Sequence, residues 1–140
     1  MRSAIFLLFA LVAGCGLGAG TSDGGVPGDA QPAVVHVLVS NTPQNVPAQT
    51  QSALGPFQLP AGATVTFTIA DSSGYDTMNV GVVDASTLNG LYPVAYGAQN
   101  GISSTTGTTP ALAAGSYVLV VQCLDILTSC SFNLTLTATY

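Results

Sequence analysis

The chain has 140 residues, of which one is basic and six are acidic, and its formal net charge is −5. The basic residue is Arg2 and all six acids are aspartates, so the polyanionic backbone of a nucleic acid would find almost no cation to pair with. This composition excludes nucleic-acid binding, lysine Schiff-base chemistry and arginine clamps for phosphate. Apolar residues make up 48% of the chain, which supports one domain with a packed core rather than a disordered polymer.

Residues 1–14 have the features of a secretory signal peptide. Arg2 precedes the apolar run AIFLLFALVA, which is shorter than the ~20 residues that a membrane-spanning helix needs. The run ends in Val12-Ala13-Gly14-Cys15, which resembles the lipobox of bacterial lipoproteins. The resemblance implies cleavage before Cys15, attachment of palmitate-type acyl chains to this cysteine and stable membrane anchoring through them. The alternative is an ordinary secreted protein in which Cys15 stands by chance.

Residues 15–32 follow as a lipidated cysteine and a tether. In lipoproteins an Asp directly after the cysteine tends to hold the protein in the inner membrane, and here this position is Gly16, which favours the outer membrane. The stretch GLGAGTSDGGVPGDAQP is rich in glycine, proline and aspartate and has no period, so we expect a flexible linker. Whether the protein faces the periplasm or the cell surface stays open.

Residues 33–140 show repeated strand patterns separated by short Gly- and Pro-containing gaps, and no helical periodicity. Strands are expected at 33–40, on both sides of Pro60-Ala61-Gly62 within 55–70, at 77–85, at 91–97 as an edge strand because of Pro93, at 116–123 and at 130–140. Residues 102–115 are expected to be mostly loop, with room for one short strand. Many short strands with tight turns predict an all-β domain, a jelly-roll-like antiparallel β-sandwich.

Cys123 and Cys130 are predicted to form a disulfide. If Cys15 carries lipid, these two cysteines remain as a pair in an oxidising compartment. We expect them to lie opposite each other in an antiparallel hairpin of 116–123 with 130–140. This register would pair three apolar couples on one face: Val121 with Phe132, Leu119 with Leu134, and Tyr117 with Leu136. The alternative is two reduced, buried cysteines.

Four stretches within residues 57–139 resemble the bacterial pre-peptidase C-terminal family of β-sandwiches: FQLPAGATVTFTI, DTMNVGVVDASTL, LAAGSYVLVVQC and CSFNLTLTA. The resemblance implies an accessory domain of secreted or surface proteins, with roles in attachment, secretion or polysaccharide contact and no catalysis. Two features depart from the family. SNTPQNVPAQTQSALG stands where the family has an acidic lead-in, and no catalytic domain accompanies the sandwich in this chain.

The residues that could carry chemistry are few. His36 is the single histidine, and the chain has neither glutamate nor a G-x-S-x-G motif, so we expect a structural or exposed histidine and a protein that is not an enzyme. The segment ADSSGYD places Asp71 and Asp76 around a turn, and with Asp84 they are weak calcium candidates that lack EF-hand spacing. Because aspartates at turns ordinarily cap the backbone, no cofactor is expected besides the lipid on Cys15.

Two sets of residues could contact a partner. Tyr75, Tyr92 and Tyr96 lie in loops or near strand ends, where they could stack on sugar rings. Leu124, Ile126 and Leu127 lie in the loop LDILTS between the two cysteines, where polar residues are usual. Either they fold back and cover the end of the sandwich, or they form an exposed apolar contact patch.

These observations predict a non-enzymatic, lipid-anchored protein of the cell envelope that displays a β-sandwich binding or adhesion module. The alternative is a structural or assembly lipoprotein that docks onto another envelope protein through a strand edge or the LDILTS loop. More distant alternatives are a calcium-binding or a carbohydrate-binding module. Expected partners are the membrane, through the lipid, and either an envelope protein or a surface polysaccharide.

Overall fold

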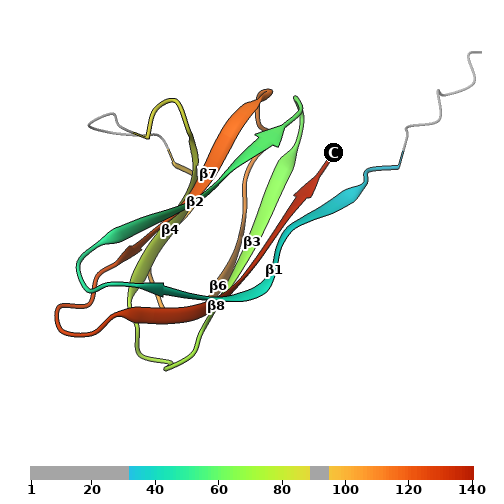
Figure 1. Cartoon of the computed structure of the whole chain (residues 1–140). Helices are drawn as coiled ribbons and strands as arrows, with labels where there is room; N and C mark the ends of the chain where they lie inside the picture. Colours follow the sequence, from blue (N-terminus) through green and yellow to red (C-terminus); the bar gives the residue numbers. More distant parts are fainter. Residues whose placement is uncertain (1–31, 89–94) are drawn as a thin grey trace, which may run out of the picture. The chain divides into compact units, whose positions relative to one another are not determined.

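Eight strands form the part of the chain that this computed structural model describes, residues 32–88 and 95–140 (Figure 1). They are β1 (Val35–Val46), β2 (Gln51–Leu59), β3 (Thr64–Asp71), β4 (Met78–Asp84), β5 (Ala95–Ile102), β6 (Thr105–Thr108), β7 (Gly115–Cys123) and β8 (Cys130–Thr139). The strands build two four-stranded antiparallel sheets, ordered β1-β8-β3-β6 and β2-β7-β4-β5. The sheets pack face to face, which confirms the predicted all-β sandwich.

The core lies between the two sheets and follows the alternation of the strands. On β8, Phe132, Leu134 and Leu136 are fully buried, while the residues between them point outward and are polar. β3 has the same pattern, with Val65 and Phe67 buried between threonines. Because side chains of a strand point alternately to its two faces, each strand gives the core one apolar row.

The predicted hairpin of 116–123 with 130–140 is wrong. β7 pairs with β2 and β4, and β8 pairs with β1 and β3, so these two strands belong to opposite sheets. The faces were assigned correctly: the six apolar residues of the proposed register all lie in the core, but three of them come from each sheet. Alternation specifies which face of a strand is buried and not which strand lies beside it. The loop 124–129 therefore crosses from one sheet to the other.

Three strands extend beyond the predicted ranges, with residues 41–46 in β1, 51–54 in β2 and 98–102 in β5. β1 continues beyond residue 40 to Val46, through register shifts between Val37 and Val39 and between Val39 and Thr42. Asn41, in the second shift, has a left-handed backbone with φ of 41°. Where pairing is irregular, side chains no longer alternate strictly between the two faces of the strand. The prediction of strands depended on this alternation.

β5 is an edge strand, as expected for the region around Pro93, but residues 91–94 of the predicted strand lie outside the described residues. The short strand allowed within 102–115 is β6. Within residues 32–88 and 95–140, nothing helical is both long enough and apolar enough to cross a lipid bilayer.

Candidate functional site: the disulfide-bonded end of the sandwich

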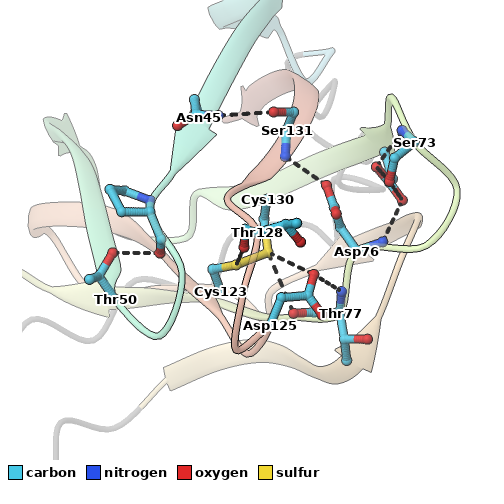
Figure 2. Close-up of a disulfide and its surroundings, with 12 residues drawn as sticks. Asn45, Thr50, Ser73, Asp76, Thr77, Cys123, Asp125, Thr128, Cys130 and Ser131 are labelled. Carbon is cyan, nitrogen blue, oxygen red and sulfur yellow. Dashed lines mark hydrogen bonds between the residues drawn. A yellow bond between two sulfur atoms is a disulfide. The ribbon is translucent and has the colours of Figure 1, made fainter.

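A disulfide closes one end of the sandwich. Cys123, the last residue of β7, is bonded to Cys130, the first residue of β8, with their Cα atoms 5.6 Å apart (Figure 2). Both cysteines are fully buried, beside Val46 and Met78. The predicted pairing is confirmed, but the bond joins the two sheets rather than two neighbouring strands.

Backbone hydrogen bonds attach the loop 124–129 to the two loops beside it. The Leu124 N–H donates to the Thr77 carbonyl at 2.8 Å, and the Gln49 N–H donates to the Asp125 carbonyl at 3.1 Å. The Cys123 N–H donates to the Thr50 carbonyl at 2.9 Å. The base of the loop is therefore fixed by the turn between β1 and β2 and by the turn between β3 and β4. The sequence did not predict these hydrogen bonds, because almost every residue type carries the same backbone N–H and carbonyl groups.

Asp125 turns its carboxylate inward, against the disulfide. Its Oδ2 accepts a hydrogen bond from the Thr77 N–H at 3.3 Å and lies 3.7 Å from Cys130 Sγ (Figure 2). A disulfide sulfur carries no hydrogen, so the second approach is a contact and not a hydrogen bond. Cys123, Asp125 and Cys130 are also the one group of three potential metal ligands close together among the described residues. Because both sulfurs are in the disulfide, no thiolate is present to bind a metal there.

Asp71 and Asp76, the calcium candidates of the neighbouring turn, cap the backbone. Asp71 accepts hydrogen bonds from the N–H groups of Ser73 at 2.8 Å and Asp76 at 3.0 Å. Burial raises the pKa of Asp71, but these bonds and the Ser73 hydroxyl outweigh it and hold the pKa below its usual value. The nearly buried Asp76 carboxylate accepts a 2.7 Å bond from the Ser131 N–H at the start of β8 (Figure 2).

Asp84 does not join these two aspartates. It lies at the opposite end of β4, where the Ser86 hydroxyl and backbone N–H lower the pKa of its carboxyl. The structure therefore brings Asp71 and Asp76 together and leaves Asp84 apart. The carboxylates of Asp71 and Asp76 already accept hydrogen bonds, an arrangement that supports capping over cation binding.

The three apolar residues of the loop are exposed at this end. Leu124 is 37% exposed, Ile126 72% and Leu127 92%, and we name these three residues the apolar tip. Tyr75, in the adjacent turn 72–77, is 89% exposed. Of the two alternatives for the loop, the structure shows the exposed one. Val46, Met78 and the disulfide are buried at this end of the core although Ile126 and Leu127 extend into solvent, so these two side chains do not cover it.

The tyrosines proposed for sugar stacking do not form a common platform in the described part of the chain. Tyr75 precedes β4, whereas Tyr96 pairs with Val82 near the other end of that strand. Tyr96 is half-buried and lies edge-on to Tyr117, with ring centroids 6.2 Å apart. Tyr92 lies outside the described residues.

His36 lies far from the apolar tip. It is half-buried on β1, pairs with Ala138 near the end of β8, and stacks on Tyr140 with ring centroids 4.2 Å apart and planes 8° apart. This aromatic contact agrees with a structural role for the histidine. Cys15, the predicted site of lipid attachment, lies outside the described residues.

The apolar tip and the start of β1 lie at opposite ends of β8. Val34 exchanges two backbone hydrogen bonds with Tyr140, and Val35 pairs with Thr139. At its other end β1 pairs Val46 with Cys130, beside the disulfide. Figure 1 shows the start of β1 next to the C-terminus and the loop between β7 and β8 at the far end of the sandwich. The polypeptide thus enters the domain at the end remote from the apolar tip.

Comparison with known proteins adds no family to this picture. No protein-family model matches the chain, and no curated protein sequence does either. The resemblance to the pre-peptidase C-terminal family rests on the four quoted stretches alone, and what the structure shows is a two-sheet antiparallel sandwich.

Proposed function

We propose that this protein is a non-enzymatic, lipid-anchored binding protein of the cell envelope, and that its apolar tip docks onto a partner protein. One observation carries the proposal: Ile126 and Leu127 are exposed on a loop whose base is fixed by a disulfide and by backbone hydrogen bonds. A fixed apolar loop loses little conformational entropy on binding, which favours a specific contact.

The charges of the domain indicate the kind of partner. The chain after residue 14 contains no lysine or arginine, so anionic lipid headgroups and acidic proteins would find no cation on it. The carboxylate of Asp125, the charged residue nearest the tip in sequence, points toward the disulfide. We therefore expect a partner with an apolar recess and an association that depends little on ionic strength.

The place where the chain enters the domain suits anchoring at Cys15. Residues 15–32 would connect the acylated cysteine to β1, which begins at the end of the sandwich remote from the tip. An anchored domain could then extend its apolar tip away from its own membrane. Mass spectrometry of the mature N-terminus tests the anchor: acylated Cys15 is expected, and in Cys15→Ser we expect loss of the acyl chains.

A photo-crosslinking residue at position 127 tests the docking surface in the native cells. We expect one dominant crosslinked partner, and the same probe at position 61 is the matched control. Ala61 is exposed in the turn between β2 and β3, at the end of the domain opposite the tip. Equal crosslinking from both positions, or none from position 127, would contradict docking through the tip.

Accessibility on intact cells decides between an adhesion module and an assembly lipoprotein. Antibody labelling and proteinase K are suitable, whereas trypsin has no lysine or arginine to cleave after in residues 15–140. Labelling and digestion of intact cells support an adhesion module on the surface. Protection until the outer membrane is opened supports an assembly lipoprotein with a partner in the periplasm.

A further inference from the structure

The outer face of the sheet β2-β7-β4-β5 carries a groove of about 210 Å³. Its floor includes Gly81 of β4 and Val120 of β7, which alternate with the core residues Val82 and Leu119. The groove therefore opens to the side of the sheet that faces away from the core. It is separate from the apolar tip and does not depend on the function proposed for the tip.

The hollow arises because β5 bends over β4. Their pairing shifts register twice, between Met78 and Val80 and between Val80 and Val82, and such shifts twist and bend an edge strand. A Cβ atom added to Gly81 would lie 2.9 Å from the Cβ of Ala95 and 3.6 Å from that of Ala98. Glycine at position 81 thus allows β5 to approach closely, and β5 forms one wall of the groove.

Four carboxamides form a row across the sheet at one end of this apolar floor: Gln51, Gln122, Asn79 and Asn100. Asn79 is held at both ends, since its Nδ2 donates to Gln122 Oε1 at 3.1 Å and its Oδ1 accepts from the Gly101 N–H at 3.0 Å. Gln51 pairs with Gln122 in the register of β2 with β7. Each carboxamide offers both N–H donors and oxygen acceptors.

None of the described residues that line the groove carries a charge. A charged ligand would lose part of its hydration shell in the groove and find no opposite charge to compensate for it. A phosphate, in particular, would lack the cations it requires. A neutral ligand that both donates and accepts hydrogen bonds and has an apolar face matches the lining. A saccharide ring has these properties: hydroxyl groups around its edge and C–H groups on its faces.

We propose that this groove binds a neutral saccharide through the carboxamides of β2, β4, β5 and β7. Its volume lies below the ~300 Å³ at which pockets for drug-sized ligands begin, so one ring fits and a neighbouring ring would extend along the face. The site differs from the tyrosines suggested by the sequence. Shallow carboxamide sites of this kind bind weakly, and we expect a Kd near 1 mM.

Nuclear magnetic resonance titration of the purified full chain tests the proposal, in a detergent without a sugar headgroup. The probes are soluble malto-, cello-, manno- and chito-oligosaccharides. We expect at least one of them to shift the amide signals of Gly81, Ala98 and Gln122 in a saturable manner. Binding by the chito-oligosaccharide alone would indicate N-acetylated cell-wall glycans, and binding by the others would indicate storage or matrix polysaccharides.

The double variant Gln51→Ala/Gln122→Ala should weaken binding about tenfold or more, because it removes two hydrogen-bonding side chains. Gln58→Ala is the matched control: Gln58 is exposed on the same strand as Gln51, outside the groove, and its removal should leave Kd unchanged. If the double variant fails to fold, Ala98→Phe, which fills the groove with a ring, should abolish binding instead. Absence of saturable shifts with all four probes, shifts away from the groove, or equal Kd for the groove variant and the control would overturn the proposal.

Discussion

Cys123 and Cys130 follow one another closely in the chain, yet their disulfide joins the two sheets of the sandwich. Cys123 ends β7 in the sheet β2-β7-β4-β5, and Cys130 begins β8 in the sheet β1-β8-β3-β6. The bond therefore holds the two layers together at the end where the apolar tip is exposed. The same disulfide thus fixes the base of the tip and closes this end of the core.

Removal of the disulfide should lower stability by about 2–3 kcal/mol, the value expected for a cross-link that closes a loop this short. The variant Cys123→Ala/Cys130→Ala avoids burying hydroxyl groups at two fully buried positions. For a domain of this size the melting temperature should fall by roughly 10 °C. Thermal unfolding by circular dichroism measures it, and reduction of the wild type is the control. A variant as stable as the oxidised wild type would contradict a stabilising role for the bond.

Two leucines, one in the core and one in the apolar tip, should respond very differently to truncation. Leu134→Ala removes a fully buried side chain from the core and should cost about 2–5 kcal/mol. Leu127→Ala removes an exposed side chain from the tip and should change stability by less than about 0.5 kcal/mol. Urea unfolding of both variants measures the difference. A large loss for Leu127→Ala would mean that the tip packs against the domain, and the docking proposal would lose its basis.

Gly107 of β6 lies directly over the ring of Phe67. A Cβ atom at position 107 would come within 2.3 Å of this fully buried ring, so Gly107→Ala must displace it. We expect a loss of about 1–3 kcal/mol from overpacking, measured by urea unfolding. Thr106→Ala on the same strand removes an exposed γ-methyl group and a hydroxyl that shares a 3.1 Å hydrogen bond with the Thr68 hydroxyl, and it should cost under about 1 kcal/mol. Similar small losses for both variants would show that β6 can move away from Phe67.

The sequence predicted which side chains are buried more accurately than it predicted which strands are paired. Phe132 and Leu134 alternate with polar residues, and this local pattern was enough to place them in the core. The partner of β8 depends on contacts distant in sequence, so Leu134 pairs with Ile69 and Thr42 rather than with Leu119. The apolar tip was open to two interpretations because its exposure depends on whether Val46 and Met78 already close the core.

The carboxamide groove had no sequence signal at all. Asn79 and Gln122 are separated by 43 positions and meet only because β4 and β7 are neighbours in register. In the sequence, Gly81 cannot be distinguished from any other glycine in a strand. Its role is evident only in the structure, where β5 approaches it closely. Features that arise from bulges and long-range register cannot be read from periodicity, which reports only the nearest residues along the chain.

Asp71 should make the stability of the domain depend on pH in the acid range. Hydrogen bonds from Ser73 and Asp76 hold its folded-state pKa below the ordinary value of 3.8, so its stabilisation is fully present above that pH. As the pH falls below 3.8 and through the lowered pKa, the folded carboxylate takes up a proton and the stabilisation is lost. Asp71→Asn removes the charge at every pH, so the difference in unfolding free energy between wild type and variant should be constant near neutrality and shrink toward pH 2–3. Urea unfolding across this range measures it, and a difference that stays constant down to the lowest pH would show that the turn 72–77 is held by its backbone and not by the charge of Asp71.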